Sequence, residues 1–90
     1  ASQQGFTVGQ NYPNPYSGET SIPLYLPHSG EVNMAVFDRT GRLIASFSEH
    51  FSAGSHTWTP SALKNIAEGM YIYRVTYGSE VISKRMIKQR

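Results

Sequence analysis

The side chains that could carry out chemistry in this chain are few and scattered. General acid and base catalysis by two carboxylates needs a pair held at a fixed separation. The acidic residues stand singly along the chain, at Glu19, Glu31, Asp38, Glu49, Glu68 and Glu80. The chain has no cysteine, so it offers neither a thiol nucleophile nor a thiolate ligand. We therefore expect neither paired-carboxylate nor cysteine chemistry.

The histidines and serines give no stronger signal. His28, His50 and His56 fall in or beside predicted turns, whereas a zinc site needs three or four converging ligands at a recognisable spacing. Ser55 follows a glycine, but the second glycine of a Gly-x-Ser-x-Gly nucleophile elbow is missing. We expect no catalytic residue, no cofactor and no metal site, and we interpret the histidines as solvated loop residues.

Aromatic side chains could form a binding surface of another kind. Rings that share one face can stack on sugars, and five are candidates for such a platform: Tyr25, Trp58, Tyr71, Tyr73 and Tyr77. Tyrosines on strands also pack half-buried, with the hydroxyl group at the surface, and we favour this structural interpretation. A carbohydrate-binding module, with polysaccharide as its partner, remains open as the alternative.

Basic residues gather at the C-terminal end. The chain carries eight basic and six acidic residues, a net charge of +2 that does not indicate nucleic-acid binding. Four of the eight basic residues fall within the last seven positions, at Lys84, Arg85, Lys88 and Arg90. On an edge strand such charges block aggregation between sheets. A partner can also recognise an exposed basic edge through strand addition, and the two interpretations are compatible.

The elements that would position these side chains are short strands. Apolar residues alternate with polar ones over residues 20–26 and 32–37, which is the period of a half-buried strand. Further strands are expected at residues 6–8, 43–47, 56–59, 69–77 and 81–87, separated by glycine or proline turns. About seven strands at this spacing predict an all-β fold, an immunoglobulin-like antiparallel β-sandwich.

Several positions have a specific expected role. Pro23 predicts a bulge or an edge in its strand because proline lacks the amide donor. Asp38 and Gly41 have the spacing of a type I turn. Gly69 and Tyr71 resemble a tyrosine corner, in which the tyrosine hydroxyl bonds to upstream backbone.

The strand at residues 69–77 has large apolar or aromatic side chains on both faces. Its tyrosines share one phase, while Met70 and Ile72 share the other. We expect either a strand covered on both sides or one whose tyrosines lie along the outer rim. Residues 61–68, just before it, are too short for an independent helix, so we predict a single turn in which Leu63 or Ile66 plugs the core.

Residues 11–16, with the sequence Asn-Tyr-Pro-Asn-Pro-Tyr, form a stiff loop that we call the clamp. Pro13 and Pro15 hold φ near about −65° and remove two amide donors, and each favours extended geometry at the residue before it, Tyr12 or Asn14. The segment can be neither a helix nor a central strand. We interpret it as a structural loop that begins a β domain, with an exposed docking ledge as the alternative.

Length and composition predict one small domain. We expect residues 1–10 to form a linker or first strand and residues 11–90 to form the β-sandwich. No apolar run approaches the roughly 20 residues of a membrane span, so we expect no transmembrane segment. The first four residues lack the basic and apolar regions of a signal peptide. An exported protein that contains this chain is therefore expected to be longer.

Taken in order, the motifs resemble one known family. The clamp is followed by a strand ending in Leu-Pro, by Val-Phe-Asp-x-x-Gly at residues 36–41, by Ala-Gly-x-His, by Gly-Met-Tyr-Ile-Tyr-Arg at residues 69–74 and by a closing Lys-Arg-Met. This pattern resembles the type A C-terminal sorting domains of type IX secretion system cargo, the Por secretion system of Bacteroidetes-like bacteria. The resemblance covers nearly the whole chain from Phe6 onward.

The resemblance implies a non-catalytic module that sends a larger cargo protein, with its passenger domain N-terminal to this chain, through the type IX machinery at the outer membrane. The destination would be the cell surface or the medium, and a sortase-like peptidase often removes such a domain. Residues matching the basic strand that the machinery recognises are Lys84, Arg85, Met86, Ile87 and Lys88. Residues matching structural motifs are Tyr12, Pro13, Asn14, Pro15, Asp38, Gly41, Gly69, Tyr71 and Tyr73. Similar modules occur on secreted glycoside hydrolases, which keeps attachment to the cell surface or to polysaccharide as the alternative.

Overall fold

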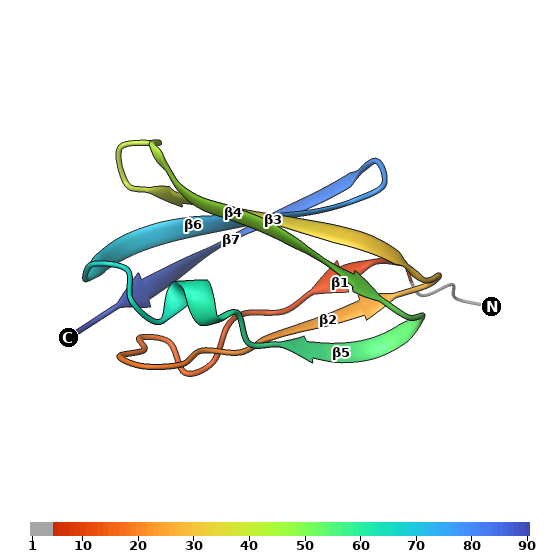
Figure 1. Cartoon of the computed structure of the whole chain (residues 1–90), viewed down its shortest axis with the longest axis horizontal. Coiled ribbons are helices and arrows are strands. Elements are labelled where there is room, and N and C mark those ends of the chain that lie inside the picture. The colour runs from red at the N-terminus through yellow and green to blue at the C-terminus, as the bar shows by residue number, and fades with distance from the viewer. Residues whose placement is uncertain (1–4) are drawn as a thin grey trace.

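The computed structural model describes residues 5–90, in which two antiparallel sheets face each other (Figure 1). The three-stranded sheet has the order β1-β2-β5, with β1 at Thr7–Val8, β2 at Ile22–Leu26 and β5 at Gly54–Trp58. The four-stranded sheet has the order β4-β3-β6-β7, with β3 at Gly30–Asp38, β4 at Leu43–Phe51, β6 at Gly69–Tyr77 and β7 at Glu80–Lys88. A short 3₁₀ segment, η1 at Ser61–Leu63, lies between β5 and β6. The predicted all-β sandwich is confirmed.

Side chains that alternate along the strands fill the space between the sheets. On β3, Val32, Met34 and Val36 are buried, while the residues between them face outward. β2 contributes its own alternating set, namely Ile22, Leu24 and Leu26. Burying one such side chain stabilises the fold by about 1.5–3 kcal/mol relative to leaving it in water. The two-residue period of the sequence is therefore realised in the core.

Pro23 departs from its predicted place. It lies in β2, the middle strand of its sheet, and pairs with Thr57 of β5 in an unbroken register, so the predicted bulge or edge strand is wrong. The pairing of β2 with β1, however, ends one residue away at Leu24. Its carbonyl oxygen accepts a hydrogen bond from the Gly9 amide, 2.8 Å away, on the β1 side. The missing amide donor faces that same side, because the N–H and C=O of one residue point together in an antiparallel strand. Since β1 ends at Val8, the proline costs no ladder hydrogen bond there.

The tyrosines of β6 face the interior. Tyr71 and Tyr73 are buried, and the Tyr71 hydroxyl donates to the Ala67 carbonyl oxygen at 2.6 Å, which confirms the predicted tyrosine corner. Met70 and Ile72 point to the opposite face and remain 39% and 40% exposed. Neither expected arrangement of this strand is found: the tyrosines are not on the outer rim, and among residues 5–90 no layer covers the outer face of the four-stranded sheet.

The turn between β3 and β4 forms as predicted. The Gly41 amide donates to the Asp38 carbonyl oxygen at 2.9 Å, and Gly41 adopts φ of +90°, which favours glycine. One carboxylate oxygen of Asp38 accepts hydrogen bonds from the hydroxyl and amide of Thr40 and from the amide of Arg42. The hydroxyl bond from Thr40 is the main cause that lowers the pKa of Asp38.

The segment before β6 closes one end of the core. Leu63 in η1 is fully buried, and Ile66 packs partly buried against the core, so the predicted plug is confirmed. Gly69 then begins β6 with φ of +152°, a conformation that other residues rarely adopt.

Candidate functional site

The histidines do not gather at a site. His28 is exposed in the turn before β3, whereas His50 lies in β4 and His56 in β5, so the expectation of loop histidines is wrong for these two. The His56 ring packs against Phe51 with 4.9 Å between centroids, and its Nε2 lies 2.7 Å from the Ser52 carbonyl oxygen. Among residues 5–90, no group of three or more metal-ligating side chains converges, and no helix is long and apolar enough to cross a membrane.

The five aromatic rings do not form a common platform. Trp58, Tyr71 and Tyr73 are buried in the core. Tyr77 is half-buried, stacks on Phe6 and donates its hydroxyl hydrogen to a backbone carbonyl of the turn before β3. The predicted stacking surface for sugars is therefore not formed, because three of the five rings are buried between the two sheets.

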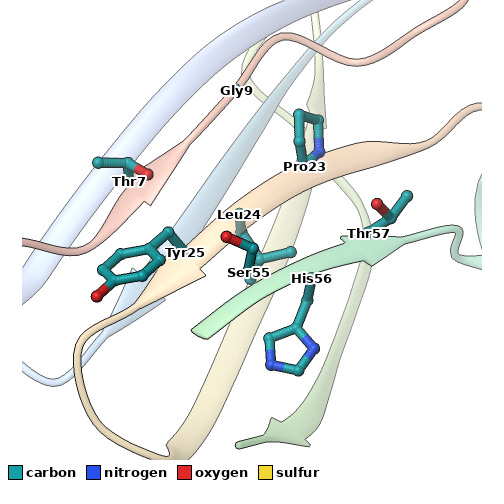
Figure 2. Close-up of a pocket in the computed structure, with 8 residues that line it drawn as sticks. All are labelled: Thr7, Gly9, Pro23, Leu24, Tyr25, Ser55, His56 and Thr57. Atoms are coloured by element: carbon teal, nitrogen blue, oxygen red, sulfur yellow. The ribbon is translucent and has the colours of Figure 1, made fainter. Parts of the chain in front are cut away.

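Tyr25 is the remaining member of that set, and it borders a shallow hollow on the outer side of the three-stranded sheet (Figure 2). Thr7, Tyr25 and Ser55 lie opposite one another across β1, β2 and β5, so their side chains share one face. Pro23 and Thr57 form the next pair along the same sheet. The lining residues include hydroxyl groups but no carboxylate, ammonium or guanidinium group. The His56 ring is the one titratable group besides Tyr25 among the lining residues, and it has no acidic or basic partner within the lining.

The predicted recognition residues all lie on β7, where their side chains divide between two faces. Met86 and Lys88 point inward and are 0% and 8% exposed, and Lys84 is half-buried on the same face. Arg85 and Ile87 are exposed on the outer face. Of the five predicted recognition residues, Arg85 and Ile87 are therefore the two whose side chains are exposed on the folded domain.

The clamp is bonded to the outer edge of β7. The Tyr16 amide donates to the Ile87 carbonyl oxygen at 3.0 Å, and the Gln89 amide donates to the Tyr16 carbonyl oxygen at 2.7 Å. The side-chain oxygen of Asn14 accepts a hydrogen bond from the Ile87 amide at 2.9 Å. The loop near the start of the domain thus satisfies backbone groups that an edge strand would otherwise leave open.

Gln10 extends this contact by one residue beyond the clamp. Its side-chain nitrogen donates to the Arg85 carbonyl oxygen at 2.6 Å and to the side-chain oxygen of Asn11 at 2.7 Å. Pro13 and Pro15 are exposed beside these contacts, each after a cis peptide bond. Sequence reasoning missed this association, because the partners are separated by more than 70 residues and no local pattern links them.

Tyr16 is the anchor of the clamp. Its ring is 1% exposed, and its hydroxyl donates to the Leu63 carbonyl oxygen at 2.9 Å. Burial, with a smaller contribution from the nearby Tyr71, raises the pKa of Tyr16 to about 12. Tyr12, which the family resemblance singled out, is 53% exposed. Tyr16 lies within the predicted clamp, but it was not among the residues singled out there as structural, so its role as the anchor was not predicted.

Tyr73 joins the clamp to β6. Its hydroxyl accepts a hydrogen bond from the Asn11 amide and donates one to the Gly9 carbonyl oxygen, both at 3.0 Å. Burial raises the pKa of Tyr73. The buried Asn11 side chain in turn donates to the Thr20 hydroxyl at 2.9 Å. The matched motif residues of β6 and of the clamp therefore form one hydrogen-bonded unit that supports β7.

Two basic side chains of β7, Lys84 and Arg85, form no salt bridge within residues 5–90, whereas Arg90 beyond the strand pairs with Glu68. On the outer face, Arg85 lies opposite the exposed Ile72, and the Arg74 guanidinium lies 4.6 Å from the centre of the Phe37 ring. The surface around β7 therefore combines exposed apolar groups with free basic groups.

A comparison with known protein families matches residues 10–89 to the family described as the secretion system C-terminal sorting domain, which serves type IX secretion. The chain belongs to this family. No significant match is found among curated proteins or among solved structures. Membership implies interaction of the sorting domain with the type IX secretion machinery. The matched region begins at Gln10 and ends at Gln89, so it includes both the clamp and the strand to which the clamp is bonded.

Proposed function

We propose that this sorting domain is a non-catalytic module that directs a larger cargo protein through the type IX machinery to the outer-membrane surface or the medium. The proposal is carried by family membership together with the position of the basic strand β7 at an edge of its sheet. An edge strand presents its backbone to a second protein along its open length. A component of the machinery can therefore contact β7 without unfolding the domain.

Within β7, we assign direct side-chain recognition to Arg85 and Ile87. An exposed guanidinium can form paired hydrogen bonds with a carboxylate of the partner, and the neighbouring apolar side chain adds contact area. Met86 and Lys88 support the strand from the inner face, where both are buried. The half-buried Lys84 adds positive charge at the edge.

The arrangement of the chain ends supports this role. Strand β1 and the C-terminus lie on opposite sides of the centre of the domain along its long axis (Figure 1). A passenger attached before β1 would thus extend away from the C-terminal end of β7 and leave it accessible. A sortase-like peptidase, the second partner implied by the resemblance, would act between the passenger and the clamp.

An export assay in a type IX-competent bacterium tests the proposal. A periplasmic reporter fused before the whole chain should reach the surface or the medium. Arg85→Glu should lower export by about tenfold or more with an unchanged melting temperature, because it repels the carboxylate that the wild-type arginine binds. Lys64→Glu is the matched control: it makes the same change in net charge at an exposed residue outside β7.

The outcomes separate the function from the residue assignment. A reporter that stays in the periplasm with the wild-type chain would contradict the sorting function. Equal export of the Arg85→Glu and Lys64→Glu variants would contradict the role of Arg85 alone. Deleting residues 84–90 is a weaker test, because it also removes the buried Met86 and the backbone contacts to the clamp.

A further inference from the structure

One stretch of the β7 edge has no hydrogen-bond partner among residues 5–90. The clamp and Gln10 bond to this edge from the Arg85 carbonyl oxygen onward. Edge-facing backbone groups recur at every second residue, so both groups of Val81 and Ser83 and the amide of Arg85 point to the same edge. We call residues 81–85 the open edge. It spans about 14 Å, which suits one short added strand.

The contact between the clamp and β7 shows that the edge of this strand can bond to a segment of extended backbone. Tyr16 lies parallel to Lys88 and exchanges backbone hydrogen bonds with the residues on either side of it. The chain thus satisfies the C-terminal part of the edge with a piece of its own extended backbone. Gln10 marks where this coverage stops, because its side chain occupies the Arg85 carbonyl oxygen. A strand from another protein would find the same kind of bonding groups immediately before that point.

The surroundings of the open edge favour an acidic partner. Lys84 lies half-buried on the inner face and Arg85 is exposed on the outer face, and neither takes part in a salt bridge within residues 5–90. A hollow of about 390 Å³ beside the edge is lined by Ile72, Ser83, Lys84 and Arg85. An extended segment with a carboxylate on each of its faces and an apolar side chain on its outer face would match both features.

We propose that the open edge binds an acidic, extended segment of a type IX partner protein as an added strand. This inference rests on the proposed function and specifies how the partner recognises the folded domain. Backbone hydrogen bonds to residues 81–85 hold the segment in place. One carboxylate on the inner face of the segment pairs with Lys84 and one on its outer face pairs with Arg85, while an apolar side chain on the outer face enters the hollow beside Ile72.

The same basic residues select against a second copy of the domain. If two β7 strands met edge to edge, Lys84 and Arg85 of both copies would be brought close together. Like charges opposite each other destabilise strand pairing, and a charge pointing inward from an edge strand has the same effect. The open edge is therefore protected from self-association while it stays available to an acidic strand.

Proline substitution at the edge tests the proposal in the export assay. Ser83→Pro removes the edge-facing amide hydrogen but no hydrogen bond to β6, since proline is tolerated where the N–H faces away from the sheet. Ser46→Pro in β4 is the matched control. The alternation continued through β6 and β3 places the Ser46 amide on the opposite free edge, and this serine is also exposed. We expect Ser83→Pro to lower export by about tenfold or more and Ser46→Pro to leave it unchanged.

The results distinguish this inference from the proposed function. If the wild-type fusion is exported and a folded Ser83→Pro variant is exported equally well, strand addition at the open edge is wrong while the sorting function stands. If the wild-type fusion is not exported, the proposed function fails, and the inference fails with it. Circular dichroism and the melting temperature establish whether each variant is folded.

A second measurement does not depend on the proline variant. The whole chain is mixed with the synthetic hexapeptide Val-Glu-Glu-Val-Glu-Glu, which carries glutamate and valine on both faces of an extended strand, and with its lysine counterpart, while amide hydrogen exchange is followed by NMR. The acidic peptide should slow exchange at the amides of Val81, Ser83 and Arg85, and the lysine peptide should leave these rates unchanged. Exchange rates at these amides that stay constant at millimolar acidic peptide, or that respond equally to both peptides, would overturn the proposal.

Discussion

The two halves of β7 share one neighbour and differ in the other. Toward β6, both halves pair in an unbroken antiparallel register. On the opposite edge, the backbone of Ile87 and Gln89 is bonded to the clamp, whereas among residues 5–90 no hydrogen bond reaches the edge-facing groups of Val81 and Ser83. The C-terminal half of β7 is fastened to the clamp. The N-terminal half keeps its edge-facing N–H and C=O groups available for a partner.

This difference shows how a small sandwich can leave part of an edge strand exposed while the strand stays in the sheet. An edge strand that lacks any partner on one side is prone to fraying and to aggregation. Here the clamp fastens one half of β7, and the buried Met86 fixes its inner face. The other half stays in place through β6 alone. We therefore expect substitutions in the clamp to act on stability and substitutions at the open edge to act on recognition.

The largest expected effect follows removal of the clamp anchor. Tyr16→Ala should lower the free energy of unfolding by about 3–5 kcal/mol, because it leaves a cavity and removes the hydrogen bond to Leu63. Tyr12→Ala is the control within the same clamp, and its exposed ring should make the loss about 0.5 kcal/mol or less. Urea unfolding measures both values. Equal losses in the two variants would contradict the assignment of Tyr16 as the anchor.

A smaller effect is expected at the side chain that caps the strand. Asn14→Ala removes the acceptor for the Ile87 amide in an exposed hydrogen bond and should cost about 0.5–1.5 kcal/mol. Amide exchange by NMR should show faster exchange at Ile87 in this variant, with little change at Ser83, which is open already. Ser83→Ala serves as the stability control and should stay within about 0.5 kcal/mol of wild type. Unchanged exchange at Ile87 would show that the clamp does not protect this half of the strand.

The smallest effect is a change in alkaline stability. The pKa of Tyr16 is raised from 10.0 to about 12, so the folded state holds this proton to higher pH than the unfolded state does. The stability that Tyr16 contributes is therefore complete below about pH 10 and is lost as the pH rises through about 12. Tyr16→Phe should cost about 1 kcal/mol at neutral pH through the lost hydrogen bond, but its stability should fall less steeply in the alkaline range.

Urea unfolding of the Tyr16→Phe variant at a series of pH values measures this slope. Tyr12→Phe is the matched control, because it removes the same hydroxyl group from an exposed ring of the clamp. A Tyr16→Phe variant with the same alkaline slope as wild type would show that the buried hydroxyl makes no contribution to the pH dependence.

Local chemistry was sufficient to predict much of the fold. The two-residue period of residues 32–37 placed Val32, Met34 and Val36 on the buried face of β3 before any partner strand was known. Asp38 and Gly41 marked a turn through preferences that depend only on their own backbone. The tyrosine corner joins groups four residues apart, so its signal is also local. The order of such motifs was specific enough to identify the family.

The sequence by itself therefore determined where the strands lie along the chain and, for residues 22–26 and 32–36, which side of the strand is apolar, because both depend on neighbours along the chain. Tertiary structure alone decided that Pro23 sits in a central strand, that the outer face at Ile72 is uncovered, and that the clamp fastens only one half of β7. These features depend on pairing between segments up to 75 residues apart. No periodicity within a segment encodes which strand becomes its neighbour or where an edge is left open.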